Sequence, residues 1–292
     1  MLRDETLTGR VMMILAALFF AMMALFVRLA AREASVGTIS FVRYAMTVAV
    51  YLPFIASGRV KIRPVNTPLI VMRAIAASFG GIFFFLAVSE ITLAEATILK
   101  YTFPLFAVAI SAIFYNERTN FLVIGIMAWS IAGVYIMVNP ESLAIQRGYL
   151  WGILNAVSAG AAVAFLRKLR ATDDSLTILF TTALAGTIMS MPLMIADWRT
   201  PSIKAFGLMI IISLCGLLAQ FFITYGMRFI KTGAGSVIMM LEVVFASVLG
   251  MTFLHHVPTS NQIIGGVMIL GGGVLLTIRR KTTTDIRTTS SK

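Results

Sequence analysis

The sequence predicts an all-α integral membrane protein with ten transmembrane helices, arranged as two inverted five-helix repeats. Its 292 residues are 59% hydrophobic and only 12% charged, with a mean hydropathy of +0.93. A single soluble core could not bury so much apolar surface, so the composition indicates that lipid is the solvent. Apolar runs long enough to span a bilayer recur along the chain, and its two halves match each other at a nearly constant offset.

Ten apolar runs have the length of roughly twenty residues that a helix needs to cross the hydrocarbon layer. The first run follows Arg3 and Arg10 and is longer than the apolar region of a signal peptide, so we assign it as a helix. The connections are short, and most contain Gly, Pro, Asn or a charged residue. We predict helices over residues 11–31, 38–57, 68–89, 93–114, 120–139, 149–167, 176–196, 205–228, 233–255 and 259–279.

Basic residues accumulate on alternate connections. The chain has 24 Lys and Arg against 12 Asp and Glu, yet one of the two sides carries only Arg32, Arg147, Arg199 and Lys204. By the positive-inside rule, the other side, which holds both termini, is predicted to be cytoplasmic. We therefore expect a multi-pass protein of the inner (cytoplasmic) membrane, surrounded by the lipid bilayer. The basic residues form no patch interleaved with aromatics, so no nucleic-acid partner is expected.

The internal match favours a duplicated unit. An offset of 139 pairs residues of the first half with Gly148, Phe165, Arg167, Pro192 and Phe222, and an offset of 140 continues the match through Gly265 and Gly273. The repeats are predicted over residues 11–139 and 149–279, between an N-terminal segment 1–10 and a tail 280–292. An odd number of helices inserts the second copy upside down, which puts a pseudo-two-fold axis in the membrane plane and a solute site near the midplane.

Two stretches resemble a known family. The first half contains Phe103-Pro104-Leu105-Phe106 and then Phe114-Tyr115-Asn116-Glu117-Arg118-Thr119, followed by Gly125 and Gly133. The second half contains Leu241-Glu242-Val243-Val244-Phe245-Ala246, Pro258-Thr259, Gly265 and Gly273. Over about residues 9–280 the chain resembles the drug/metabolite transporter superfamily, specifically its ten-helix members with two EamA-type domains. Val257 stands opposite Glu117, so the second half lacks the acidic residue that the family pattern has there.

Six charged residues inside the predicted spans are candidates for a functional role: Arg28, Arg43, Arg73, Glu95, Lys100 and Glu242. A charge at the bilayer centre costs about 2.5–3.5 kcal/mol, so each needs a partner, a hydrated cavity or a route to the interface. Arg28 lies close enough to a helix end to extend to the headgroups, whereas Arg43, Arg73 and Glu95 fit either a structural or a substrate-binding role.

Lys100 and Glu242 are the deepest of these charges, and they are the leading candidates for substrate binding. Pro104 lies four residues after Lys100, so it removes a hydrogen bond to the Lys100 carbonyl and predicts a helix kink there. Lys100 is expected to attract a carboxylate or phosphate, and Glu242 to pair with a substrate amine or a coupling proton. The alternative is a structural kink in which Lys100 pairs with a neighbouring carboxylate. Tyr101, Arg43, Arg73 and Glu95 are further candidates for the substrate site.

The preferred interpretation is a secondary transporter that exports an amino-acid-like or related zwitterionic metabolite. An importer or exchanger of an organic anion, vitamin or nucleotide-like metabolite is the alternative, and a channel or structural membrane protein is the alternative of another class. The sequence contains no P-loop and no evident catalytic constellation, so neither an ATP-driven pump nor an enzyme is expected. His255 and His256 are adjacent rather than one helical turn apart, so no metal site is expected, and no cofactor is implied.

Overall fold

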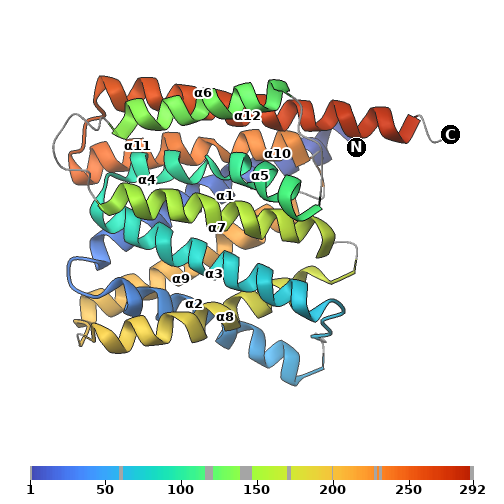
Figure 1. Cartoon of the computed structure of the whole chain (residues 1–292). Helices are drawn as coiled ribbons and strands as arrows, with labels where there is room; N and C mark the ends of the chain where they lie inside the picture. Colours follow the sequence, from blue (N-terminus) through green and yellow to red (C-terminus); the bar gives the residue numbers. More distant parts are fainter. Residues whose placement is uncertain are drawn as a thin grey trace.

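The computed structural model describes residues 2–58, 62–115, 121–138, 147–169, 172–198, 200–226, 229 and 232–289, and every regular element in these ranges is a helix. Long helices run side by side, and α1 begins at the same end of the bundle at which α12 finishes (Figure 1). The helices are α1 Leu2–Ala30, α2 Val36–Ala56, α3 Thr67–Glu90, α4 Leu93–Lys100, α5 Phe103–Tyr115, α6 Phe121–Val138, α7 Arg147–Leu169, α8 Ser175–Ala196, α9 Ile203–Gly226, α10 Thr232–Met239, α11 Leu241–Leu254 and α12 Ser260–Thr289.

Within the described residues, eight helical stretches are long and apolar enough to cross a membrane by length and composition. Two further apolar stretches, Ile124–Met137 in α6 and Ser260–Leu275 in α12, are shorter. The all-helical membrane architecture is therefore confirmed, while the count of ten spans stays a prediction. α1 and α12 extend beyond the predicted spans 11–31 and 259–279, because apolar residues mark the lipid-facing part of a helix rather than its ends.

Two of the predicted spans are broken in the middle. The span 93–114 consists of α4 and α5 with a turn at Tyr101 and Thr102, which lie just before Pro104. Pro104 has no N–H to donate to the Lys100 carbonyl, which accounts for the break, and it is instead the second residue of α5, where a missing N–H is tolerated. The span 233–255 consists of α10 and α11, which meet at Met240 without a proline. There the Tyr101 hydroxyl donates to the Met239 carbonyl and so occupies a backbone acceptor at the break.

Helices from the first half pack against helices from the second half. The main pairs are α1 with α9, α2 with α8, α3 with α7, and α6 with α12, and α4 packs against α11. The largest buried cluster joins α1, α3, α4, α9 and α11, and it includes Phe85, Leu99 and Met209. Its members are apolar and closely packed, so the bundle interior between the halves is continuous.

Small residues bring paired helices into contact. A Cβ atom built on Gly265 of α12 would lie 2.4 Å from the Gly133 carbonyl oxygen of α6, so the two backbones touch at this point. Polar side chains bridge other pairs, since Asn155 of α7 donates to the Gly80 carbonyl at 2.7 Å and Ser78 of α3 donates to the Thr182 carbonyl at 3.1 Å. Close backbone approach and interhelical hydrogen bonds are the usual means of packing helices in lipid.

Asp173 joins the connection that precedes α3 to the connection that precedes α8. Its carboxylate accepts hydrogen bonds from the backbone N–H groups of Val65 at 2.7 Å and Asn66 at 3.3 Å, and from the Thr172 hydroxyl at 2.6 Å. Burial alone raises the pKa of this carboxyl, but these donors favour its charged form and leave the pKa below its ordinary value. The charged carboxylate therefore stabilises this end of the bundle.

We predict that Asp173→Asn lowers the thermal stability of the purified protein at pH 7, because the amide replaces a charged acceptor. The pKa of Asp173 is lower in the folded than in the unfolded state, so its contribution is complete above the unfolded value of about 3.9 and is lost as the pH falls through the folded value. Melting curves of the two proteins should therefore converge below about pH 4. Equal melting temperatures at pH 7 would contradict this role.

Candidate functional site

The two leading candidates from the sequence form an ion pair. The Lys100 ammonium lies 2.7 Å from Oε1 and 2.8 Å from Oε2 of Glu242, although 142 residues separate them. Lys100 is the last residue of α4 and Glu242 is the second residue of α11, so the pair connects the breaks in the two interrupted spans. The Glu242 side chain is fully buried and that of Lys100 is 23% exposed. A carboxylate in this environment requires its cation.

Aromatic rings complete the surroundings of the pair. The Tyr101 hydroxyl donates to Glu242 Oε2 at 2.9 Å, and the Lys100 ammonium lies 4.7 Å from the ring centroid of Phe20 and 5.0 Å from that of Phe84. Cation–π attraction is strongest where water is excluded, as it is beside the buried Glu242. In this conformation both charges are neutralised by each other, so the structure matches the alternative in which Lys100 pairs with a neighbouring carboxylate.

Arg43 and Arg73 line a second polar region, a pocket of about 160 Å³ between α2, α3, α8 and α9. The Arg43 guanidinium lies 4.8 Å from the Tyr44 ring centroid and 5.4 Å from that of Phe85. Arg73 donates to the Thr182 hydroxyl and to the Ile178 carbonyl at 3.3 Å. The pocket therefore combines two cations from the first half with the polar side chains of Thr182 and Gln220 from the second.

Arg28, by contrast, lies apart from this pocket. Its guanidinium donates to the Val88 carbonyl at 3.0 Å and so ties α1 to α3.

Glu95 lies at the opposite end of the bundle from the chain termini, where α4 begins. The Glu95 backbone N–H donates to the Thr92 hydroxyl oxygen at 3.3 Å, and the Thr92 backbone N–H donates to the Glu95 carboxylate at 2.9 Å. These two hydrogen bonds form a capping box. The same carboxylate accepts from the Tyr149 hydroxyl and from the Gln262 amide at 2.8 Å. Glu95 thus connects α4 to α7 and α12, and its carboxylate is saturated by donors from this chain.

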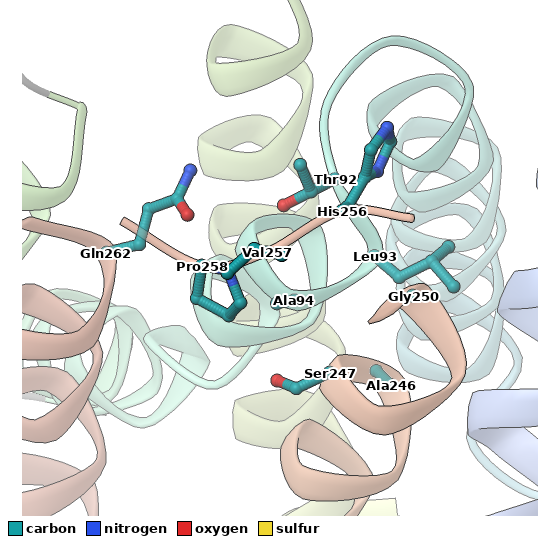
Figure 2. Close-up of a pocket in the computed structure, with 10 residues that line it drawn as sticks. All are labelled: Thr92, Leu93, Ala94, Ala246, Ser247, Gly250, His256, Val257, Pro258 and Gln262. Atoms are coloured by element: carbon teal, nitrogen blue, oxygen red, sulfur yellow. The ribbon is translucent and has the colours of Figure 1, made fainter. Parts of the chain in front are cut away.

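A small pocket adjoins Glu95 between the start of α4, the end of α11 and the connection 255–259 (Figure 2). Figure 2 shows Gln262 approaching from α12 and His256 lying beside Thr92. The pocket encloses only about 10 Å³, which is the space of a single water molecule. Residues from three helices therefore close this end of the bundle around Glu95.

Apart from Tyr101, the substrate-site residues predicted from the sequence were all charged, and most of their uncharged neighbours were not among them. Tyr44 and Thr182 line the pocket with the arginines, and Tyr149 and Gln262 bind Glu95. Tyrosine, threonine and glutamine occur throughout the predicted spans, so nothing in their sequence positions distinguishes them. Only the rotation of each helix about its axis decides which of them face a charge.

Three comparisons bear on the chain as a whole. The model of the EamA-like transporter family matches residues 7–139 and, a second time, residues 146–278. The pseudopaline exporter CntI of Pseudomonas aeruginosa strain UCBPP-PA14 is 28% identical over 284 residues, which cover 96% of this chain and 100% of that protein. The S-adenosylmethionine uptake transporter of Rickettsia prowazekii is 21% identical over 233 residues, which cover 80% of this chain and 79% of that protein.

A solved crystal structure supports the fold alone. It is 19% identical in sequence, has a TM-score of 0.56, and covers 95% of this chain and 98% of the other. Both named relatives are membrane transporters rather than enzymes.

We predict that Lys100→Met destabilises the protein strongly, because it leaves the buried Glu242 carboxylate without its cation. Breaking one side of a buried pair costs about 3–5 kcal/mol, whereas removing both sides costs much less. The double variant Lys100→Met/Glu242→Leu should therefore melt at a higher temperature than Lys100→Met in detergent. Lys204→Met is the matched control, since Lys204 lies 3.8 Å from Glu33 in an exposed pair. A Lys100→Met melting temperature equal to that of the control would contradict the prediction.

Proposed function

The chain belongs to the EamA-like transporter family, and we propose that it is a secondary transporter that carries a small metabolite across the cytoplasmic membrane by alternating access. The observation that carries the proposal is the meeting of two family-matched halves at a polar pocket and at the Lys100–Glu242 ion pair. Carriers built from inverted repeats bind their solutes near the midplane, where the repeats meet.

The pattern of helix contacts supports the inverted repeat. Exchanging the halves exchanges the α1–α9 contact with the α3–α7 contact, and the α3–α8 contact with the α2–α9 contact. The α2–α8 and α6–α12 contacts exchange onto themselves. A contact set with this property is expected from a two-fold axis that relates the halves. The five predicted spans of each half then make one copy antiparallel to the other.

The interrupted helices support alternating access. A break inside a membrane helix exposes backbone groups, which is tolerated where protein or a hydrated cavity satisfies them. α4 and α5 break beside Lys100, and α10 and α11 break beside Glu242, so both breaks meet at one ion pair. Protonation of Glu242 would remove the charge that holds Lys100, so a coupling proton belongs to the proposal. The distribution of basic residues supports a cytoplasmic location for both termini, which is part of the proposal.

Export is the preferred direction, because the pseudopaline exporter matches along 96% of this chain and the uptake transporter along 80%. The expectation of a zwitterionic cargo depended on Lys100 and Glu242 each facing the solute. Since they pair with each other, the pocket that contains Arg43 and Arg73 favours the second candidate, an organic anion. A channel is the contrasting class, and it differs from a carrier in its flux kinetics.

We predict saturable flux through the reconstituted protein. Proteoliposomes loaded with a mixture of amino acids, organic acids and nucleotides are diluted into buffer, and mass spectrometry follows the loss of each compound. At least one compound should leave faster than from protein-free vesicles, and its exit should accelerate when the same compound is added outside. Flux that rises linearly with concentration and shows no such acceleration would indicate a channel, and no flux at all would reject transport of these solutes.

Ala77→Phe should lower this flux by about tenfold or more, because Ala77 lines the pocket and a phenyl ring fills much of its volume. Ala49→Phe makes the same change at an exposed position of α2 and should transport like the unmodified protein. Equal flux through the two variants would show that the transported solute does not pass through this pocket.

A further inference from the structure

The pocket between α2, α3, α8 and α9 is lined by residues at equivalent positions of the two halves. An offset of 139 pairs Arg43 with Thr182, and both residues line the pocket. The same offset pairs Ala77 with Gly216 and Gly81 with Gln220, and these residues line it as well. A pocket whose wall consists of such related pairs surrounds the axis that relates the repeats. This is the position at which a carrier of this design holds its solute.

The charge of the pocket is not symmetric. Arg43 and Arg73 both belong to the first half, and the second half offers Thr182 and Gln220 in their vicinity. Lys100 and Glu242 cancel each other elsewhere in the bundle, so they supply no net charge to this region. The pocket wall contains no carboxylate among the described residues, and none of these residues forms an ion pair with Arg43. The lining is therefore cationic.

Glycines on the neighbouring helices leave the space in which the side chains of Arg43 and Tyr44 pack. A Cβ atom on Gly81 of α3 would lie 2.1 Å from the Tyr44 hydroxyl oxygen, and one on Gly216 of α9 would lie 3.3 Å from Nε of Arg43. The Tyr44 hydroxyl donates to the Ser78 carbonyl at 3.3 Å. The guanidinium also lies against the faces of two aromatic rings, which orient it without neutralising it. Arg43 is thus positioned, and since its guanidinium donates to no other residue in the described part of the chain, its donors can bind a solute.

We propose that this pocket is an anion-binding site whose ligand is a small organic anion, with a carboxylate or phosphate group held by Arg43 and assisted by Arg73. The inference rests on the proposed function and names its substrate class. A guanidinium binds a carboxylate or phosphate through two parallel hydrogen bonds, which gives both affinity and orientation. The 160 Å³ pocket is smaller than the roughly 300–1,000 Å³ of sites for drug-sized ligands. It therefore fits a small metabolite or the anionic end of a larger one.

The test measures binding by the purified full-length protein at constant ionic strength. Glutarate, glutaramide and 1,5-diaminopentane have five-carbon chains and differ in charge, and pyrophosphate represents the phosphate class. We expect glutarate or pyrophosphate to raise the melting temperature, and glutaramide and diaminopentane to leave it unchanged, because a ligand that binds the folded state stabilises it. The anion that gives the larger shift identifies whether the site prefers carboxylate or phosphate.

Arginine variants assign the effect to the pocket. Arg43→Gln should weaken anion binding by about tenfold or more, the loss expected for charge-assisted hydrogen bonds. Arg43→Lys, which keeps the charge without the planar fork, should fall between this variant and the unmodified protein. Arg32→Gln is the matched control, since it removes one exposed arginine outside the pocket and should bind anions normally.

Several outcomes overturn the anion site. These are the absence of any response to both anions, equal stabilisation by glutaramide or diaminopentane, and anion binding by Arg43→Gln that equals that of the Arg32→Gln control. Transport of neutral or cationic solutes without anion binding would reject the anion site and leave the transporter standing. Anion binding without flux of any solute would instead contradict the transporter and leave the site intact.

Discussion

The Lys100–Glu242 ion pair is the interaction on which the arrangement of the two halves depends. Glu242 is fully buried, so its negative charge is tolerable only with a cation in contact, and that cation comes from the other half of the chain. The pair also lies at the two helix breaks, where the Tyr101 hydroxyl is within hydrogen-bond distance of both Glu242 and the Met239 carbonyl and has one proton to share between them. The buried charges are therefore neutralised at the same place where a backbone carbonyl at a helix break accepts a hydrogen bond. These contacts connect α4, α5, α10 and α11.

The other charged side chains of the bundle have different kinds of partner, and these differences suggest which positions are structural and which face a solute. Glu95 is saturated by Thr92, Tyr149 and Gln262, which close one end of the bundle around it. Arg28 meets a backbone carbonyl, which ties α1 to α3. Arg43 meets only aromatic faces among the described residues, beside a pocket. A cation without a counter-ion inside the membrane raises the free energy of the folded protein, and a bound anion can offset this cost.

The sequence predicted the membrane architecture because lipid burial is a property of composition and run length, which a single chain displays directly. Depth within a span drew attention to Lys100 and Glu242, and their role in substrate binding stays a prediction. Their direct contact depends on packing between residues 142 positions apart, which no single span reveals. Pro104 predicted one helix break, whereas the break at Met240 has no proline and involves a hydroxyl from Tyr101. The pocket was beyond sequence reasoning, because an arginine five residues from a helix end can face lipid headgroups or a cavity equally well.

The repeat and the pocket chemistry have different consequences for function. Residues at equivalent positions of the two matched halves, such as Arg43 and Thr182, line one pocket, and in the proposed inverted repeat this pocket is where a solute would lie. Only the departures from symmetry determine what that solute is, because two identical walls would carry identical charges. Here both arginines of the pocket come from the first half, so the proposed preference for an anion would depend on side chains that can change without changing the fold. The ion pair at the helix breaks is separate from this wall, which allows relatives of one architecture to carry chemically different cargo.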